Sequence, residues 1–453
     1  MVTVFGHPSI PKIIPLVYTE TQPFEVYNKI SRNYKYSFLF ESLTGPDELA
    51  ETSIMGFDPK LIVKGYFDKI TIENRDGVIE TIHTKTPLDE LKKLVKKTED
   101  VTYRYLGGAV GNIDYDAIRL FEDIPGNKNL NKAIMEFGIY EDGILYDNKK
   151  KQFLYFYYDE DRSETIKRID GTFGTFEISD ISPNLNEYEF EEIVNKAKKY
   201  VYSGDVFQVV LSRRFSFTGK GDYLKVYEKL RKLNPSPYMF HLKMNNNTII
   251  GSSPEMLLRV TGKDVETFPI AGTRKITDNE EENKKLKDEL QKDEKELAEH
   301  TMLVDLGRND IGRVCNYGTV KVKELMQIKR FSHVQHIVTH VVGKLNEKYD
   351  MYDAFEAVFP AGTVSGAPKV RAMEVIHELE PIQRGTYAGA IGYFSFNGCC
   401  DFAIAIRSIF ADNDRGFVQA GAGIVFDSVA KNELKETEHK ANAMITALKE
   451  ATE

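Results

Sequence analysis

Two pairs of glutamates are candidate metal ligands because the members of each pair are three residues apart. Glu296 and Glu299 lie in a stretch with helical character, and Glu433 and Glu436 lie near the C-terminus. Residues at this spacing are neighbours on a helix, so each pair projects two carboxylates from one side. Two such helices facing each other would offer oxygen ligands for Mg²⁺. Taken alone, charged pairs at this spacing are more often solvated helix faces.

A candidate carboxylate-binding arginine follows small residues in the sequence. Residues 401–410 read as one strand, with Ala403, Ala405 and Arg407 on the same face. Small side chains leave space above the strand, and a guanidinium offers a two-pronged donor to a carboxylate. The alternative is an arginine that reaches solvent from the end of a strand.

Two small-residue segments are candidate ligand-binding loops. Gly421, Ala422 and Gly423 would let backbone amides approach a ligand closely. Thr363 lies in a loop before a helix that Pro368 begins. Neither segment has the spacing of a dinucleotide or phosphate-binding fingerprint. The Gly-x-Ser-x-Gly elbow is also missing, which disfavours a hydrolase triad.

The elements that must position these residues predict an α+β fold. Residues 1–182 read as short strands of an antiparallel, sheet-contributing region, and we place the boundary with a catalytic region, 183–453, after a proline-containing break. Asn186 and Glu189 form a capping box for the next helix. Meandering strands with helices outside suggest packed antiparallel sheets rather than a doubly wound parallel sheet. The segments predicted as strands or helices are Phe38–Phe40, Leu61–Gly65, Gly107–Gly111, Phe153–Tyr158, Phe207–Phe215, Glu281–Asp305, Ala388–Phe396, Asp401–Phe410 and Phe417–Val425.

The clearest predicted unit is a hairpin with a two-residue turn at Asn397–Gly398, of the type I′ kind. Counting outward from this turn pairs Ala388 with Arg407. Tyr387 could lie beside Arg407 only if a bulge occurred near Gly385 or Gly389.

The bulk composition excludes some classes of partner. The 453 residues carry 60 basic and 69 acidic side chains, a net charge of −9, which argues against nucleic acid or an anionic membrane as the main partner. Three cysteines without a CxxC pair favour a reducing, cytoplasmic compartment. We expect neither a signal peptide within Met1–Ile14 nor a membrane-spanning helix.

Six segments together resemble the chorismate-binding family, which includes anthranilate, aminodeoxychorismate, isochorismate and salicylate synthases. They occur in family order across about residues 185–445. The segments are Phe207–Phe215 (FQVVLSRRF), Gly251–Met256 (GSSPEM), Pro269–Arg274 (PIAGTR), Ala298–Asp310 (AEHTMLVDLGRND), Phe359–Lys369 (FPAGTVSGAPK) and Gly421–Val425 (GAGIV). The resemblance implies two packed antiparallel sheets flanked by helices, with the active site in the cleft between them.

The resemblance also implies roles for individual residues. Glu299 and Glu436 would bind Mg²⁺, supported by Glu296 and Glu433. Glu255 would be the general acid for the departing C4 hydroxyl of chorismate, with His336 and Thr363 also counted as catalytic. The residues that would hold the substrate carboxylates are Gly272, Thr273, Tyr387, Arg407, Gly421, Ala422 and Gly423.

Two positions favour the anthranilate synthase reaction within this family. Isochorismate and salicylate synthases carry a lysine where this chain has Gln208, and an amide cannot deprotonate water. Aminodeoxychorismate synthases often carry a lysine where this chain has Ala271, which leaves space for free ammonia. An aminodeoxychorismate synthase component and a catalytically silent, tryptophan-sensing or scaffold subunit remain the alternatives.

The resemblance further implies two partners. Nothing in the chain resembles a glutaminase domain, so we expect a hetero-oligomer in which a separate glutamine amidotransferase subunit supplies ammonia. Leu39–Ser42 and Asn234–Phe240 resemble the two elements of a pocket for L-tryptophan as feedback inhibitor, with Phe40 in place of the usual leucine. The tryptophan-binding residues would be Glu41, Ser42, Pro237, Tyr238 and Met239. Tryptophan as a purely structural filler is the alternative.

Overall fold

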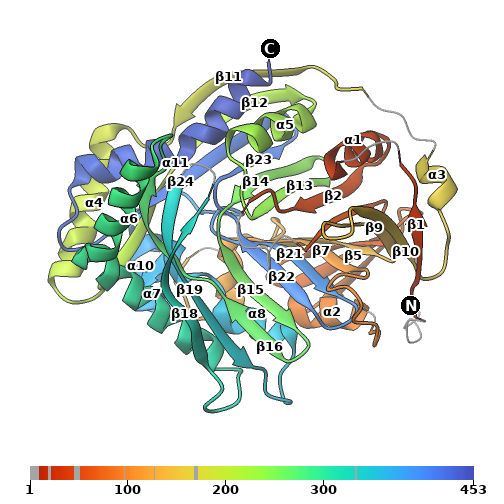
Figure 1. The fold of residues 1–453 in the computed structure, drawn as a ribbon, viewed down its shortest axis with the longest axis horizontal. Coiled ribbons are helices and arrows are strands. Elements are labelled where there is room, and N and C mark those ends of the chain that lie inside the picture. The colour runs from red at the N-terminus through yellow and green to blue at the C-terminus, as the bar shows by residue number, and fades with distance from the viewer. Residues whose placement is uncertain are drawn as a thin grey trace.

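Two large antiparallel sheets face each other, and helices cover their outer sides and ends (Figure 1). This arrangement, seen in a computed structural model, confirms the predicted α+β sandwich. The structure describes residues 10–18, 22–44, 51–95, 97–126, 128–167, 172–331 and 334–452. Residues 1–9, part of the segment in which we expect no signal peptide, lie outside these ranges.

The first sheet has twelve strands among the described residues, and its neighbours pair antiparallel. In spatial order the strands are β1 (Lys12–Leu16), β10 (Gln152–Tyr157), β9 (Asp142–Asp147), β3 (Thr52–Phe57), β2 (Tyr36–Glu41), β13 (Tyr238–Met244), β14 (Asn247–Ser253), β23 (Ser408–Asp412), β24 (Arg415–Ile424), β12 (Gln208–Gly221) and β11 (Phe176–Pro183), with the short β20 (Gly366–Ala367) paired to β12.

The second sheet also has twelve described strands in antiparallel order. They are β17 (Ile270–Lys275), β19 (Val334–Lys344), β16 (Asp264–Thr267), β15 (Met256–Thr261), β22 (Cys400–Ile404), β21 (Ala390–Ser395), β7 (Gly108–Ile113), β8 (Met135–Tyr140), β4 (Leu61–Gly65), β5 (Lys69–Asn74) and β6 (Ile79–His83), with β18 (Lys321–Arg330) paired to β19.

Helices surround the two sheets, and no described helix is long and apolar enough to cross a membrane. They are α1 (Pro23–Asn33), α2 (Pro87–Leu94), the 3₁₀ helix η2 (Tyr115–Leu120), α3 (Ser163–Lys167), α4 (Glu187–Tyr202), α5 (Tyr223–Leu233), α6 (Glu280–Lys292), α7 (Glu294–Gly312), α8 (Met351–Val358), α9 (Gly362–Ser365), α10 (Lys369–Leu379) and α11 (Ala430–Glu450). The stretch predicted as one helix or a pair over Glu281–Asp305 is the pair α6 and α7.

The predicted start of α4 shows how local sequence sets an element. The Asn186 side chain accepts the Glu189 N–H at 3.0 Å, and the Glu189 carboxylate accepts the Asn186 N–H at 2.8 Å. These bonds satisfy two donors that a helix start leaves free. Phe190 and Val194 then turn into a buried cluster against β12 and β24.

The main hydrophobic core lies between the two sheets. Phe38 of the first sheet and Phe137 and Phe394 of the second belong to one buried cluster. A separate cluster fills the outer side of the first sheet under α1, α5 and α11, where Tyr27 and Met444 are fully buried. Both sheets therefore have an apolar inner face, as a packed sandwich requires.

Both sheets combine strands from the two ends of the chain. In the first sheet β2 pairs with β13, and in the second β7 pairs with β21. The boundary at residue 182 stays a prediction.

The predicted two-residue turn at Asn397–Gly398 is wrong. The Ser395 N–H donates to the Cys399 carbonyl at 2.8 Å, so the loop has three residues, with Gly398 at a φ of 78°. A three-residue hairpin loop ending in a left-handed glycine is a common alternative to the type I′ turn. The register moves by one residue, to Ala390 opposite Ile404. Just beyond this pairing a bulge occurs beside Gly389: the Ala388 N–H donates to the Ala405 carbonyl at 3.0 Å, the Ala405 N–H donates to the Gly389 carbonyl at 2.9 Å, and Ala388 has a φ of 63°.

The single strand predicted over 401–410 is also wrong, because the chain changes sheets within it. β22 ends at Ile404 in the second sheet, and β23 begins at Ser408 in the first. Arg407 adopts a φ of 51°, outside the extended region of a regular strand. The alternating faces expected along this stretch therefore end at Ile404.

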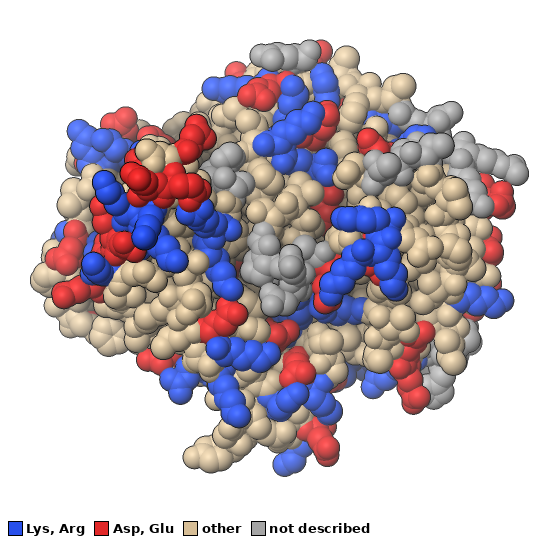
Figure 2. All heavy atoms as spheres, in the orientation of Figure 1, with Lys and Arg blue, Asp and Glu red and all other residues tan. Residues whose placement is uncertain are grey.

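Charged side chains of both signs mix over the surface. In Figure 2, basic and acidic residues lie next to one another over much of the face shown, for example around α6 at the left. Interspersed charge of this kind is typical of a solvated protein surface.

Candidate active site

Arg407 lies at the point where the chain passes from one sheet to the other. Its guanidinium makes no hydrogen bond or ion pair within the described residues, although Tyr387 and Glu436 are near enough to favour its charge. Desolvation by burial outweighs them and lowers the pKa of Arg407. A half-buried, unpaired guanidinium between two sheets is suited to binding an anionic ligand.

Tyr387 and the Gly421 segment lie together beside this arginine. A Cβ added at Gly421 would come within 2.9 Å of the Tyr387 hydroxyl, so the two touch. β24 pairs with β12 over almost its whole length, but with β23 only from Arg415 to Val418. The β24 edge at Gly421–Gly423 that faces away from β12 thus has no strand partner among the described elements. Backbone amides on that edge are available to a ligand.

The four predicted metal-binding glutamates come from α7 and α11, and three of them contact a nitrogen donor. Glu299 accepts the Gln208 amide at 2.7 Å, Glu436 pairs with Lys440 at 2.6 Å, and Glu296 pairs with Arg274 at 3.2 Å. With the side chains in these positions, no three His, Cys, Asp or Glu groups in the described ranges form a ready metal cage.

The negative charges of these carboxylates nevertheless repel one another. Burial raises the pKa of Glu299, and the negative charges of Glu296 and Glu436 raise it further. Burial likewise raises the pKa of Glu433, with Glu436 adding to the effect. A divalent cation would relieve this repulsion, and carboxylate oxygens are the ligands that Mg²⁺ prefers. The residues present therefore fit such an ion.

Glu255 is a buried carboxyl that is protonated at neutral pH. It is 6% exposed, and burial raises its pKa to about 8. Thr363, the Ile270 N–H and the charge of Lys440 oppose this shift without cancelling it. The Thr363 hydroxyl is buried and makes no hydrogen bond of ordinary geometry within the described chain, although it lies close enough to Glu255 to lower its pKa. Glu255 can therefore donate a proton near neutral pH.

His336 is held as a neutral imidazole next to the glycine bulge of β17. Its Nδ1 lies 2.8 Å from the Gly272 carbonyl and 3.1 Å from the Thr273 hydroxyl. Burial lowers its pKa to about 4, and the positive charges of Arg407 and Lys440 act in the same direction. A Cβ at Gly272, whose φ is 62°, would lie 3.1 Å from Glu296. The Gly272 backbone thus approaches the acidic cluster closely.

The predicted residues converge on one region, and Lys440 of α11 lies within it. Its ammonium donates to the Gly421 carbonyl at 2.9 Å, and its charge acts on Glu255 and His336. Lys440 is not among the site residues predicted from the sequence. Its spacing of four from Glu436 was the available signal.

A second missed feature is a buried ion pair behind the site. Lys369 donates to the Asp310 carboxylate at 2.6 Å and to the Val358 carbonyl at 3.0 Å. The pair joins α7 to the start of α10, and both helices contact α9, the short helix in which Thr363 lies instead of the predicted loop. Both residues lie in the family-like segments, Asp310 at the end of one and Lys369 at the end of another.

The five predicted tryptophan-binding residues line one cavity, away from this site. Glu41, Ser42, Pro237, Tyr238 and Met239 surround a cavity of about 60 Å³. The sequence did not indicate the charged residues that share the lining, Arg104, Arg259 and Asp401.

The charged groups around this cavity are already paired. Arg259 binds Asp401 at 2.6 Å, and the Tyr238 hydroxyl donates to the same carboxylate at 3.0 Å. Glu41 accepts Arg231 at 2.6 Å and the Tyr227 hydroxyl at 2.8 Å. The Glu41 carboxylate is therefore used to anchor α5 to β2.

Known proteins resemble this chain over nearly its whole length. Anthranilate synthase component 1 from Methanothermobacter marburgensis is 44% identical, covering 100% of this chain and 98% of the relative. The same component from Saccharolobus solfataricus is 44% identical, covering 94% of this chain and 97% of the relative.

A solved structure supports the same grouping. The crystal structure of anthranilate synthase component I from Streptococcus pneumoniae superposes with a TM-score of 0.77 at 38% identity, covering 89% of this chain and 93% of that one. Residues 35–446 match the family described as chorismate binding enzyme. The chain therefore belongs to the chorismate-binding enzyme family.

Proposed function

We propose that this protein is the synthase subunit of anthranilate synthase, converting chorismate and ammonia into anthranilate and pyruvate. The observation that carries the proposal is the Gln208 side chain. Its amide nitrogen donates to Glu299 at 2.7 Å, and its oxygen is buried without a hydrogen-bond partner in the described chain. Gln208 therefore faces the acidic cluster, where an amide has no basic lone pair to activate water.

The same reasoning applies to the nucleophile. Ala271 of β17 carries only a methyl group, at the position where a lysine amine would compete for the substrate ring. With neither a base for water nor an attached amine, dissolved NH₃ is the nucleophile that remains. The 38–44% identity to anthranilate synthase components supports this assignment.

The reaction then has two balanced stages. Ammonia adds at C2 of chorismate while the C4 hydroxyl leaves as water, taking its proton from Glu255, whose pKa of about 8 keeps it protonated. The aminated ring next loses its enolpyruvyl group as pyruvate and becomes aromatic. Arg407, Tyr387 and the free β24 edge hold carboxylates of the substrate, and the neutral His336 lies beside them without adding a charge.

Glu299 and Glu436, with Glu296 and Glu433, would hold Mg²⁺. When bound, the ion supplies charge neutralisation and orientation for the ring carboxylate rather than hydroxide. Lys440 keeps the Glu436 carboxylate in place in the absence of the ion.

The ammonia comes from a separate glutamine amidotransferase subunit. A glutaminase needs a reactive thiolate, but burial raises the pKa of Cys315 to about 11 and also raises those of Cys399 and Cys400. None of the three cysteines is therefore suited to attack glutamine.

Tryptophan is the feedback inhibitor, bound in the cavity between Ser42 and Asp401. The cavity has an apolar wall with Met239 and Phe40 and a polar wall with Arg104 and Asp401, which suits an amphipathic amino acid. If tryptophan were only a structural filler of the cavity, a saturating concentration of tryptophan would leave the enzyme activity unchanged.

The test is an assay of chorismate, an ammonium salt and Mg²⁺, followed by anthranilate fluorescence. We expect anthranilate and pyruvate in equal amounts, and no turnover with glutamine until the partner subunit is added. Accumulation of aminodeoxychorismate without pyruvate would assign the alternative reaction. If neither product formed, the chain would be assigned as a catalytically silent subunit.

A further inference from the structure

Arg384 is the largest fully buried side chain of the described structure and has no role in the chemistry above. It lies just after α10, three residues before Tyr387. Its guanidinium donates to both oxygens of Glu380, at 2.9 and 2.8 Å. It also donates to the Val364 carbonyl and the Val210 carbonyl, each at 2.7 Å. An arginine that satisfies four acceptors holds them in a fixed relative geometry.

Two of these contacts fill a gap in the first sheet. On one side β12 pairs with β20 at Gln208 and Val209, and with β11 only from Phe215 onward. Between them the Val210 carbonyl accepts from Arg384, and the Ser212 N–H donates to Glu380 at 2.8 Å. The Arg384–Glu380 pair thus takes the place of a missing strand beside β12, next to Gln208.

A third contact reaches α9, the short helix that carries Thr363. The Val364 carbonyl follows Thr363 directly, and Arg384 is its side-chain donor. Gly366 and Ala367 then pair with β12. One guanidinium consequently ties together the two segments that present Thr363 to Glu255 and Gln208 to Glu299.

We propose that Arg384 is a positioning residue: through the Val364 and Val210 carbonyls, its guanidinium fixes the backbone that sets Thr363 against Glu255 and Gln208 against Glu299. The catalytic part of this inference rests on the proposed function. The backbone part does not, because it concerns how α9 is held to β12.

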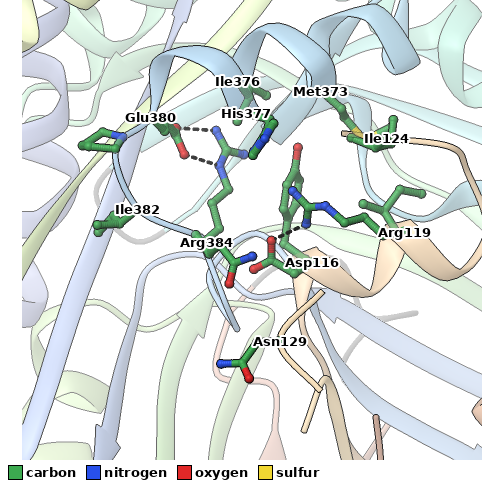
Figure 3. A pocket seen from close by; sticks show the side chains of 14 residues that line it. Asp116, Arg119, Ile124, Asn129, Met373, Ile376, His377, Glu380, Ile382 and Arg384 are labelled. Atoms are coloured by element: carbon green, nitrogen blue, oxygen red, sulfur yellow. Dashed lines mark hydrogen bonds and ion pairs between the residues drawn. The ribbon is translucent and has the colours of Figure 1, made fainter. Parts of the chain in front are cut away.

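The surroundings of Arg384 make the proposal testable by chemical rescue. A cavity of about 510 Å³ opens next to it, lined by α10, η2 and the turn at Pro381–Gln383. In Figure 3, Arg384 points toward Glu380 on one side of this cavity. The bonded pair of Asp116 and Arg119 lies on the other side. The Arg384 side chain is only 1% exposed, but its removal in Arg384→Ala would open the vacated space to the cavity.

The experiment compares Arg384→Ala and Arg384→Lys with Arg162→Ala. Arg162 serves as the control because its side chain is only 11% exposed and binds Asp142 at 2.6 Å and Asp58 at 2.7 Å, at the other end of the first sheet. With ammonium as substrate, we expect Arg384→Ala to lower kcat by on the order of 10²-fold, with little change in KM for chorismate, as for a misplaced catalytic group. Guanidinium chloride at non-denaturing concentration should restore part of the kcat of Arg384→Ala and none of any loss in Arg162→Ala.

Arg384→Lys provides a pH readout and covers the case in which the alanine variant does not fold. Glu255 faces the Thr363 hydroxyl of α9, the Ile270 N–H of β17 and the ammonium of Lys440 on α11. If Thr363 moves away, one group that lowers the pKa of Glu255 is lost. The basic limb of the kcat profile should then shift to higher pH in Arg384→Lys and stay in place in Arg162→Ala.

Hydrogen exchange separates this inference from the proposed function. Amides of residues 362–367 should exchange faster in either Arg384 variant than in Arg162→Ala, whatever the protein catalyses. A wild-type protein that made no anthranilate would overturn the proposed function and leave this measurement valid. Unchanged exchange in these residues, or equal kcat losses in the Arg384 and Arg162 variants without rescue, would overturn the positioning role.

Discussion

The ionisable groups around the candidate tryptophan cavity form ion pairs, whereas several of those in the candidate active site do not and have shifted pKa values instead. Around the cavity, Arg259 pairs with Asp401 and Arg231 with Glu41. In the active site, burial leaves Glu255 with a raised pKa and lowers the pKa of His336 and of the unpaired Arg407. Perturbed groups of this kind are typical of sites that perform chemistry, whereas satisfied pairs are typical of structural or binding surfaces. Within the described structure, Glu255, His336 and Arg407 thus lack the ion pairs that the charged groups around the cavity have.

The largest effect should follow removal of one carboxylate from the acidic cluster. Glu436→Gln should abolish Mg²⁺-dependent turnover, because a neutral amide cannot replace an anionic ligand. Stability should change little, since Glu436 and Lys440 are 44% and 35% exposed. Calorimetric titration with Mg²⁺ and the anthranilate assay measure the two effects. Glu450→Gln on the same helix is the control, and equal metal binding by both variants would refute the ligand assignment.

The next effect concerns the buried acid. Glu255→Gln should lower kcat by roughly 10²–10⁴-fold, because the departing hydroxyl loses its proton donor. The wild-type basic limb, near the Glu255 pKa of about 8, should disappear in this variant. Steady-state kinetics across pH 6–9 check both expectations. A variant that kept full kcat would remove Glu255 from the mechanism.

Breaking one ion pair tests the other side of the comparison. Arg259→Met should lower the free energy of unfolding by about 3–5 kcal/mol, because Asp401 is left buried without its counter-charge. The double variant Arg259→Met/Asp401→Leu should recover much of that loss. Arg407→Met should cost far less, since it removes a cation that has no partner in the described structure, while weakening chorismate binding. Urea unfolding of the four proteins decides whether the contrast holds.

Sequence patterns predicted what depends on local spacing. The capping box of α4 and the strand β4 follow from residues within a few positions of one another. The paired glutamates of α7 and α11 were visible for the same reason. Family-like segments supplied the remaining site residues, whose roles stay predictions.

The features that the sequence did not predict depend on the third dimension. The passage of 405–407 between sheets reflects a left-handed Arg407, which no alternation pattern encodes. The role of Arg384 depends on a gap beside β12, a strand more than 160 residues away in the sequence. Long-range contacts of this kind leave no periodic pattern in the amino-acid sequence.

Glu255 should also make the stability of the protein depend on pH. The Glu255 pKa is about 8 in the folded protein against 4.5 for the free side chain. Between these values the folded state binds more protons than the unfolded chain, so the free energy of unfolding falls as pH rises, by up to about 1.4 kcal/mol per pH unit. Glu255→Gln should therefore gain stability over wild type from pH 5 to 8, measured by urea unfolding. Parallel pH dependence of the two proteins would contradict the buried, protonated acid.

The interleaving of strands from both ends of the chain has a consequence for biosynthesis. β7 finds its partner β21 only after the 276 residues between Ile113 and Ala390 have been made. Until then a nascent chain exposes unpaired strand edges and apolar inner faces, which are prone to aggregate. Neither sheet can close on the ribosome before most of the polypeptide has emerged, so this protein must complete its sandwich at the end of translation rather than piece by piece.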